Sequence, residues 1–356
     1  MAISRRAVLI GLTGLGISPQ AALSTIDGHP AFIACCRLSD GSFAVAVITP
    51  EGQILRTEIL AGRGHDVAIS PDRSVVVVFA RRPGRFALVL DPAGREPPAA
   101  FAPPPDRHFY GHGFFSTDGA LLYATENDFD AERGVLGVYD VKSGFQRQAE
   151  LDCHGIGPHQ AILMKDGRTV CVANGGIATH PDYPRQKLNL PSMAPALVYL
   201  DRETGALLER VTLDDTLRQL SLRHLAEAGN EIWIGGQYEG ARGDQVPLIA
   251  THRLGHPLEP VEAPADLYAS MNHYVGSISA SVDGSRVAAT SPRGGKAVIW
   301  NRTRRSILKV SDLADVGGVA RDQSGFALSG GDRIVRANGA AHGFPGLLWD
   351  NHMRAL

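Results

Sequence analysis

The chain has 356 residues, a formal net charge of −2 and 44% hydrophobic residues. Because acidic and basic residues are interspersed, the sequence lacks the concentrated basic region that is typical of nucleic-acid-binding proteins. No apolar run reaches the roughly 18 residues that a membrane-spanning helix needs. We therefore expect this protein neither to bind nucleic acid nor to span a membrane.

Residues 1–24 form the first predicted element, an export signal. Arg5 and Arg6 precede a short, Gly-rich apolar region at residues 7–17, and small residues follow as a cleavage zone. This order resembles a twin-arginine signal; the alternative is a disordered N-terminus with a chance arginine pair. Because twin-arginine export carries folded proteins, we predict a periplasmic protein whose mature part, residues 29–356, forms one domain.

The mature chain begins with three predicted strands, at residues 32–38, 43–49 and 54–60. The turn after the second of them matches the turn that follows the third strand of later units, so this first unit lacks an innermost strand. Residues 351–356 align with residues 64–69, which begin the next unit. We predict that the C-terminal strand pairs into the N-terminal unit and removes both free sheet edges.

The repeating unit is clearest at residues 107–140, where an Asp-Gly turn leads into a strand at residues 121–125. An acidic loop is predicted from Glu126, and residues 135–139 form the next strand. Seven turns of this kind, two of them degenerate, divide the chain into strand meanders. The one helical candidate, residues 215–228, is interpreted mostly as strand and turn.

The spacing of the units predicts the architecture. His65, His112 and His159 are each separated by 47 positions, and an insertion near residues 177–195 lengthens the next interval, to His224. Seven four-stranded blades of that length need about 329 residues, close to the length of the mature chain. The pattern therefore predicts an all-β, seven-bladed β-propeller of the YVTN or WD40-like type, and it disfavours a pair of β-sandwiches or a β-helix.

Propeller geometry brings the starts of all the inner strands to one channel. In five of the seven predicted blades a histidine stands at that position: His65, His112, His159, His224 and His352. In the other two blades the aligned residues are Gly276 and, approximately, Gly318. A ring of imidazoles is suited to Fe, Cu or, less favourably, Zn. Only neutral imidazole binds metal, so binding is expected to weaken below about pH 6.

A structural role is the alternative for these histidines, because WD-type repeats also place a Gly-His pair before the inner strand. Against it, the regular Trp-Asp partner of such repeats is missing here except at Trp349-Asp350. Further polar residues are predicted on the same face of the propeller, in loops that could bind a ligand or remain solvated. These binding candidates are Arg107, His108, Glu126, Asp128, Asn174, His180, Asp182 and Gln237. Four of them, Glu126, Asp128, His180 and Asp182, are expected as outer contributors to the metal site.

The four cysteines form no C-x-x-C pair, so neither a zinc knuckle nor a c-type haem site is supported. Cys35 and Cys36 are interpreted as small buried apolar residues. A disulfide between Cys153 and Cys171 remains open. The sequence contains no G-x-S-x-G elbow and no H-E-x-x-H motif, so no catalytic residue is assigned.

Several segments together resemble a bacterial family of unknown function. They are the twin-arginine signal, RHFYGHGFFS, LLYATENDF, GIGPHQ, VANGGIATHPD, LRHL and the terminal WDNH. The resemblance covers essentially the whole mature chain. It implies a periplasmic propeller encoded near imelysin-like iron-regulated proteins and a dihaem thiol-oxidoreductase-like protein, with a role in iron or copper handling. It implies no known catalytic residue.

The leading prediction is therefore a periplasmic propeller that binds a transition metal or a metal-handling partner, in iron or copper acquisition. A scaffold for the iron-uptake proteins, with no metal of its own, is the first alternative. A propeller-type lactonase or oxidoreductase is the second.

Overall fold

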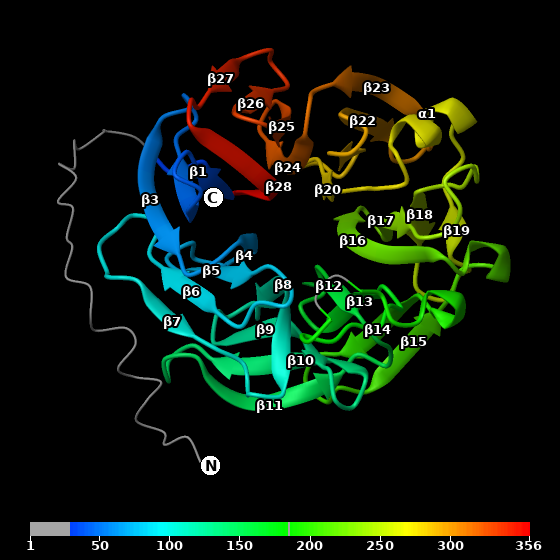
Figure 1. Cartoon of the computed structure of the whole chain (residues 1–356), viewed down its shortest axis with the longest axis horizontal. Helices are drawn as coiled ribbons and strands as arrows, with labels where there is room; N and C mark the ends of the chain where they lie inside the picture. Colours follow the sequence, from blue (N-terminus) through cyan, green and yellow to red (C-terminus); the bar gives the residue numbers. More distant parts are fainter. Residues whose placement is uncertain (1–28, 184–185) are drawn as a thin grey trace.

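The computed structural model describes residues 29–183 and 186–356. They form seven four-stranded antiparallel sheets arranged as blades around a central axis, which confirms the predicted seven-bladed β-propeller (Figure 1). The predicted export signal lies outside the described residues. Within those residues, no helix has the length and apolar character needed to cross a bilayer.

The blades are numbered from the one that contains both ends of the ring, and their strands are given from the innermost to the outermost. Blade 1 contains β28 (Leu347–Ala355), β1 (Phe32–Leu38), β2 (Phe43–Ile48) and β3 (Ile54–Leu60). Blade 2 contains β4 (Gly64–Ile69), β5 (Val76–Ala80), β6 (Ala87–Leu90) and β7 (Ala99–Phe101). Blade 3 contains β8 (Arg107–Phe115), β9 (Leu121–Asp128), β10 (Arg133–Asp140) and β11 (Gln146–Asp152).

The remaining blades follow in chain order. Blade 4 contains β12 (Pro158–Leu163), β13 (Thr169–Asn174), β14 (Ala196–Asp201) and β15 (Leu207–Val211). Blade 5 contains β16 (Leu220–Ala228), β17 (Glu231–Tyr238), β18 (Ile249–His252) and β19 (Glu259–Pro260). Blade 6 contains β20 (Ser277–Ala280), β21 (Arg286–Ser291), β22 (Lys296–Asn301) and β23 (Ile307–Asp312). Blade 7 contains β24 (Val316–Asp322), β25 (Gly325–Gly330), β26 (Arg333–Arg336) and β27 (Ala341–Gly343).

Blade 1 closes the ring as the sequence predicts. Strand β28 pairs antiparallel with β1, with Phe32 opposite Ala355 and Leu38 opposite Leu347. In Figure 1 the red C-terminal strand lies beside the blue N-terminal blade. Trp349 and Met353 of β28 are buried in the same apolar cluster as residues of β1 and β2. Closure therefore satisfies the backbone groups at both ends of the sheet and buries apolar surface.

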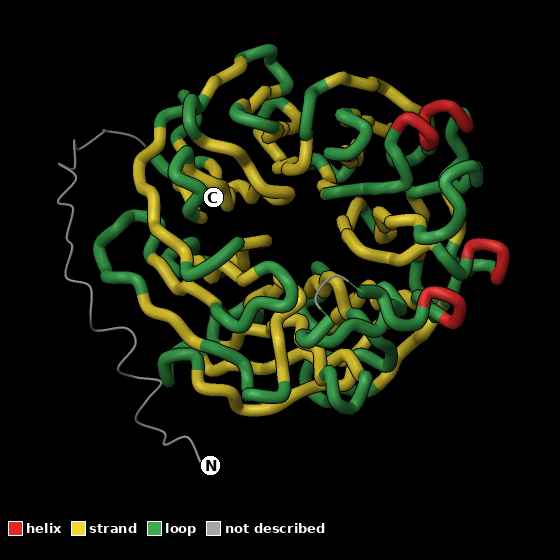
Figure 2. The backbone as a smooth tube through the Cα atoms, viewed as in Figure 1, coloured by secondary structure: helices red, strands yellow, loops and turns green. Residues whose placement is uncertain are grey.

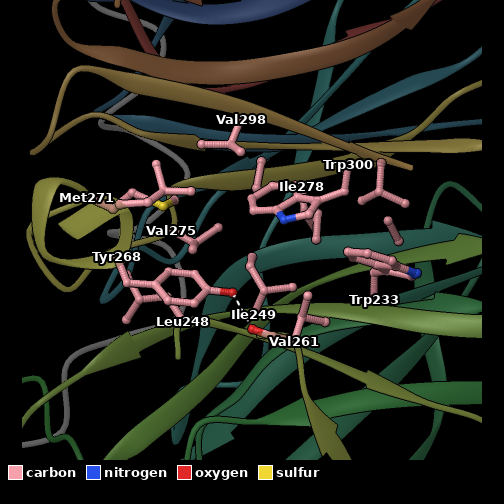
Figure 3. Close-up of a cluster of buried hydrophobic side chains, with 14 of the residues drawn as sticks. Trp233, Leu248, Ile249, Val261, Tyr268, Met271, Val275, Ile278, Val298 and Trp300 are labelled. Atoms are coloured by element: carbon pink, nitrogen blue, oxygen red, sulfur yellow. Dashed lines mark hydrogen bonds between the residues drawn. The ribbon is translucent and has the colours of Figure 1, made fainter. Parts of the chain in front are cut away.

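Apolar side chains fill the spaces between neighbouring blades. Figure 3 shows the largest of these clusters, between blades 5 and 6, where the fully buried rings of Trp233 and Trp300 lie 6.2 Å apart. The hydroxyl of Tyr268 donates to the carbonyl of Val261 at 2.7 Å in the same cluster. Cores of this kind follow from strands that are apolar on both faces, as in Val76–Ala80.

Among the residues that the structure describes, helical structure is confined to short segments at the periphery of the propeller (Figure 2). They are α1 (Ala265–Ser270), η2 (Leu190–Ser192) and η3 (Asp215–Leu217). The helical candidate at residues 215–228 is indeed mostly strand, because η3 gives way to β16. Helix α1 is not anticipated by the sequence pattern; it buries Leu267 and Tyr268 against the core of blades 5 and 6.

Two local expectations are wrong. Strand β9 continues through Glu126 to Asp128, where an acidic loop is expected, because both carboxylates are buried against arginines of neighbouring strands. The two consecutive glycines Gly235 and Gly236, which the sequence suggests as a turn, lie inside β17. All four cysteines are buried and free. Cys153 and Cys171 lie in different apolar clusters and do not form a disulfide.

Candidate metal centre

Irregular inner strands position the five predicted histidines at the channel. Each of their strands contains a register shift against the next strand, and four histidines lie within the shifted segment: His65, His112, His159 and His352. In β16 the extra residue is Arg223, and His224 follows it directly. A β-bulge bends the strand and re-aims its side chains, which is why bulges are frequent beside functional sites.

The structure brings the five imidazoles, from here on the histidine cluster, into one compact group. Neighbouring rings have centroids 4.6 Å apart for His65 and His352, and 4.7 Å apart for His159 and His224. Rings from blades that are not adjacent are almost as close, with 4.9 Å between His224 and His352. The rings therefore fill the axis of the propeller and do not line a wide, wet pore.

The nitrogens of these rings have few partners inside the protein. Four of the five histidines are buried, with exposed fractions of 1–4%, and His159 is partly buried. Six buried ring nitrogens have no hydrogen-bond partner in the described part of the chain: Nδ1 of His65, Nε2 of His112, Nε2 of His159, both nitrogens of His224 and Nε2 of His352. Buried polar atoms are normally paired, so these nitrogens are available to a partner common to the rings.

Asp66 determines which nitrogen of His112 faces the cluster. The Nδ1–H of His112 donates to Oδ2 of Asp66 at 2.7 Å, and Arg354 holds the same carboxylate through two nitrogens. With Nδ1 protonated, Nε2 carries the free lone pair. A carboxylate that orients a histidine in this way is the usual partner of a metal-ligating imidazole, because it fixes the tautomer and increases the basicity of the ring.

The environment keeps the imidazoles neutral. Burial is the main cause that lowers the pKa of His65, His159, His224 and His352 well below the ordinary value, and neighbouring cluster histidines add to the effect. The pKa of His112 is also lowered by burial, against the opposing influence of Asp66. Neutral imidazole is the form that binds a metal, so protons compete weakly for this site at neutral pH.

Potential ligand atoms of the histidine cluster lie close together in two groups. In each of these groups, the potential ligand atoms all lie within 4.8 Å of one another. His65, His112 and His159 form the first group, and His112, His224 and His352 form the second. Two nitrogens that each lie about 2.0 to 2.1 Å from one ion are at most about twice that distance apart. Small movements of the rings would therefore bring the nitrogens of one group within bonding distance of a common ion. Both groups contain His112, whose Nδ1 is occupied by Asp66. The two groups therefore overlap at His112.

A cavity of about 690 Å³ occupies the channel on one side of the histidine cluster. Its wall contains the residues that follow the histidines along the inner strands, including Val67, Gly113, Gln160, Leu225 and Met353. It reaches the turns between first and second strands, a surface called here the far face. The opposite surface, where the chain enters the inner strands, is called the near face. The far-face cavity is thus lined by residues that lie one or two positions after the cluster histidines.

Three of the other predicted binding residues lie in a salt-bridge network of blade 3 and not in the histidine cluster. Glu126 is fully buried and accepts from Arg147 at 3.0 Å and from the hydroxyl of Tyr139. Asp128 pairs with Arg107 at 3.0 Å and with Arg133 at 2.8 Å. Burial raises the pKa of Glu126, against the effect of Arg147. These contacts occupy the carboxylates, so the structure does not bring them to the imidazoles.

The remaining predicted residues have separate surroundings. His108 is buried, bonded to Asn127 at 3.0 Å, and its pKa is lowered by burial to about 4. Asn174 donates to the carbonyl of Cys153 at 2.8 Å, and Gln237 is buried and bridges to Tyr274. His180 lies 3.6 Å from Asp182. None of them belongs to the two groups of potential ligands found among the described residues.

Sequence reasoning did not identify Asp66 and Arg354, although each lies within two positions of a cluster histidine. Asp66 contacts His112, 46 positions away, because their blades are neighbours in the ring. The Gly111-His112 pair offers a local signal. Gly111 has φ of +102°, and a Cβ there would lie 2.5 Å from Cδ2 of His65. The glycine is therefore required for the imidazole of the adjacent blade to pack against this strand.

Comparisons with known proteins give a family and a fold. The model of a family described as "Protein of unknown function (DUF1513)" matches residues 58–356. A search of curated proteins gave no match. Among solved structures, the Kuenenia stuttgartiensis hydrazine synthase is similar in fold, with a TM-score of 0.61 and 11% sequence identity. The alignment covers 93% of this chain and 100% of that one. At this identity the likeness extends to the fold alone.

Proposed function

The chain belongs to the DUF1513 family of proteins of unknown function, and we propose that it binds one transition-metal ion through the histidine cluster. The observation that carries this proposal is the concentration of six unpartnered, buried ring nitrogens at the channel axis. Leaving so many polar atoms unpaired is costly unless something binds them. A metal ion offers one partner to several rings at once.

The ligand chemistry indicates which ions fit. Both ligand groups consist of imidazoles only, without thiolate or carboxylate. Imidazole suits Cu, Fe and Zn, whereas Mg and Ca prefer oxygen ligands. We propose Fe or Cu as the physiological ion and Zn as the weaker candidate. Asp66 would favour the binding of any of these ions, because its hydrogen bond to Nδ1 of His112 keeps Nε2 of that ring unprotonated and available as a ligand.

The biological setting is proposed on the sequence resemblance. A twin-arginine signal would deliver the folded protein to the periplasm, where it would take part in iron or copper acquisition. Imelysin-like and dihaem-type periplasmic proteins are the proposed partners. The buried position of the histidine cluster supports retention of an ion more than rapid exchange, because ligands in a rigid propeller axis are preorganised.

Elemental analysis of the full chain, exported by its own host, tests the proposal. We expect close to one equivalent of Fe or Cu, and uptake of one equivalent by protein first stripped with a chelator. His112→Ala should abolish tight binding. The matched control is His252→Ala, because His252 is also buried and hydrogen-bonded, to Tyr199 and His256, but lies outside the cluster.

Protein that is purified without metal and takes up neither Cu, Fe nor Zn would overturn the proposal. Equal loss of metal in both histidine variants would also contradict it, since that outcome would reflect damage to the fold and not removal of a ligand.

A further inference from the structure

We propose that the near face binds a multivalent oxyanion, carrying carboxylate or phosphate groups, next to the histidine cluster. The proposed recognition elements are five arginines, called the near-face arginines: Arg63, Arg81, Arg82, Arg223 and Arg293. Arg63 immediately precedes β4, and Arg81 and Arg82 follow β5. Arg293 connects β21 to β22, and Arg223 lies in the bulge of β16. These positions share the end of the sheets at which the inner strands begin.

Arg223 is nearly buried and incompletely paired. Its side chain is 13% exposed, and its Nε is buried without a hydrogen-bond partner. Within residues 29–183 and 186–356 its one ion pair is a long contact of 3.4 Å to Oε1 of Glu239, and that carboxylate also binds Lys187. A guanidinium that is nearly buried and incompletely paired is costly unless a further anion completes its hydrogen bonds. Arg223 immediately precedes His224, so that anion would lie beside the cluster.

Two further arginines face aromatic rings and have no ion pair among the described residues. The guanidinium of Arg82 lies 6.0 Å from the ring centre of Tyr110, and that of Arg293 lies 4.7 Å from the ring centre of Tyr274. Asn351, which immediately precedes His352, donates to the hydroxyl of Tyr274 at 2.8 Å. Cation–π contacts hold the arginines in place while leaving their N–H groups free to donate.

Arg63 and Arg81 share one carboxylate, that of Asp350, at 2.5 and 3.7 Å. Together with Lys187, the near-face arginines thus make six cations, and the carboxylates paired with them are those of Asp350 and Glu239. The local field therefore favours anions.

The chemistry of these groups selects the ligand class. Guanidinium groups form two parallel hydrogen bonds to carboxylate and phosphate oxygens, which gives geometric specificity as well as affinity. Because the arginines come from blades 2, 5 and 6, a ligand with more than one anionic group fits them better than a simple monovalent ion. When a metal is bound, such an anion could also supply it with an oxygen ligand; this extension alone rests on the proposed function.

The test measures anion binding to the metal-free full chain by calorimetry, with citrate and inorganic phosphate as separate probes at low ionic strength. We expect both to bind, with citrate tighter if the site takes polycarboxylates and phosphate tighter if it takes phosphate esters. Arg223→Met, which keeps the length of the side chain, should weaken the better probe about tenfold or more. The double variant Arg82→Gln with Arg293→Gln changes the more accessible positions and tests the site even if Arg223→Met does not fold.

The matched control is Arg321→Gln, because Arg321 is an exposed arginine at the far-face cavity. It should leave the affinity within about twofold, as expected for a surface change away from the site. Failure of both probes to bind, unchanged affinity in the near-face variants, or equal loss in Arg321→Gln would overturn the proposal. None of these results depends on metal, so the anion site and the metal site can fail separately.

Discussion

Five consecutive blades of the propeller contribute a histidine to the axis, and two consecutive blades contribute glycine. In blade 6, β20 pairs with β21 without a register shift, and a Cβ on Gly276 would lie 2.5 Å from Cδ of Pro292. In blade 7, a Cβ on Gly318 would collide with Oγ of Ser329 and lie 3.0 Å from the backbone nitrogen of Met353. The histidine blades project an imidazole ring toward the axis, whereas in the glycine blades the backbone packs directly against neighbouring residues.

This difference shows how a repeated fold makes a site that is not symmetric. Five rings with centroids about 5 Å apart already fill the axis, so the last two blades have no room for a side chain there. They provide support instead. The hydroxyl of Ser277 lies 3.3 Å from Nδ1 of His352, and Thr290 donates to the carbonyl of Gly317 at 2.6 Å.

The largest expected effect comes from removing the strand at the junction between the two kinds of blade. Deleting residues 349–356 takes away Trp349 and Met353, whose burial is worth about 3–5 and 2–5 kcal/mol in comparable cores. A domain is stable by only about 5–15 kcal/mol, so we expect no cooperative thermal transition. Circular dichroism checks this, and an unchanged melting temperature would show that the ring closes without β28.

The second effect is confined to the histidine blades. Asp66→Asn replaces the carboxylate that accepts the hydrogen bond from Nδ1 of His112 with a neutral amide. We expect the metal affinity to be about 10- to 100-fold weaker. Asp322→Asn is the control, because Asp322 also forms a two-nitrogen pair with its arginine, Arg336, outside the cluster. Competition with a chelator measures both, and equal affinities in the two variants would remove Asp66 from the account.

The third effect is confined to the glycine blades. Gly318→Ala should destabilise the protein by about 1–3 kcal/mol through overpacking against Ser329 and Met353, while metal stoichiometry stays at one. Gly243→Ala is the control, because a Cβ there meets nothing within 4 Å and its φ is not in the left-handed region. Denaturant titration compares the two, and a neutral Gly318→Ala would mean that this blade could have accepted a side chain.

The smallest effect per residue is a pH dependence of the metal-free protein. The folded-state pKa of each cluster histidine lies below the ordinary value of about 6.5, so the unfolded chain binds protons first on acidification. Stability should therefore fall as pH decreases below about 6.5, by up to about 1.4 kcal/mol per pH unit for each histidine. Replacing His159 and His224 with Gln should reduce the slope by two protons, and an unchanged slope would contradict these shifts.

The sequence predicts the fold almost completely because repetition carries the information. The interval between His65, His112 and His159 gives the blade length, and the similarity of residues 351–356 to residues 64–69 gives the closure. The same regularity predicts that the histidines converge, since equivalent positions in a ring face one axis.

Contacts between blades are not encoded in that way. The bond from His112 to Asp66 depends on how two neighbouring sheets are rotated against each other, and the strand pattern does not specify it. Glu126 is expected in a loop because carboxylates are rarely buried, yet Tyr139 and Arg147 supply the partners that make its burial possible. The bulges likewise break the two-residue period from which strands are recognised.

X-ray absorption spectroscopy of the full chain, loaded with one equivalent of Cu or Fe, tests the central claim most directly. We predict a single ion whose nearest shell contains at least three imidazole nitrogens at about 2.0–2.2 Å. An oxygen-only shell, or a spectrum unchanged by His112→Ala, would contradict it.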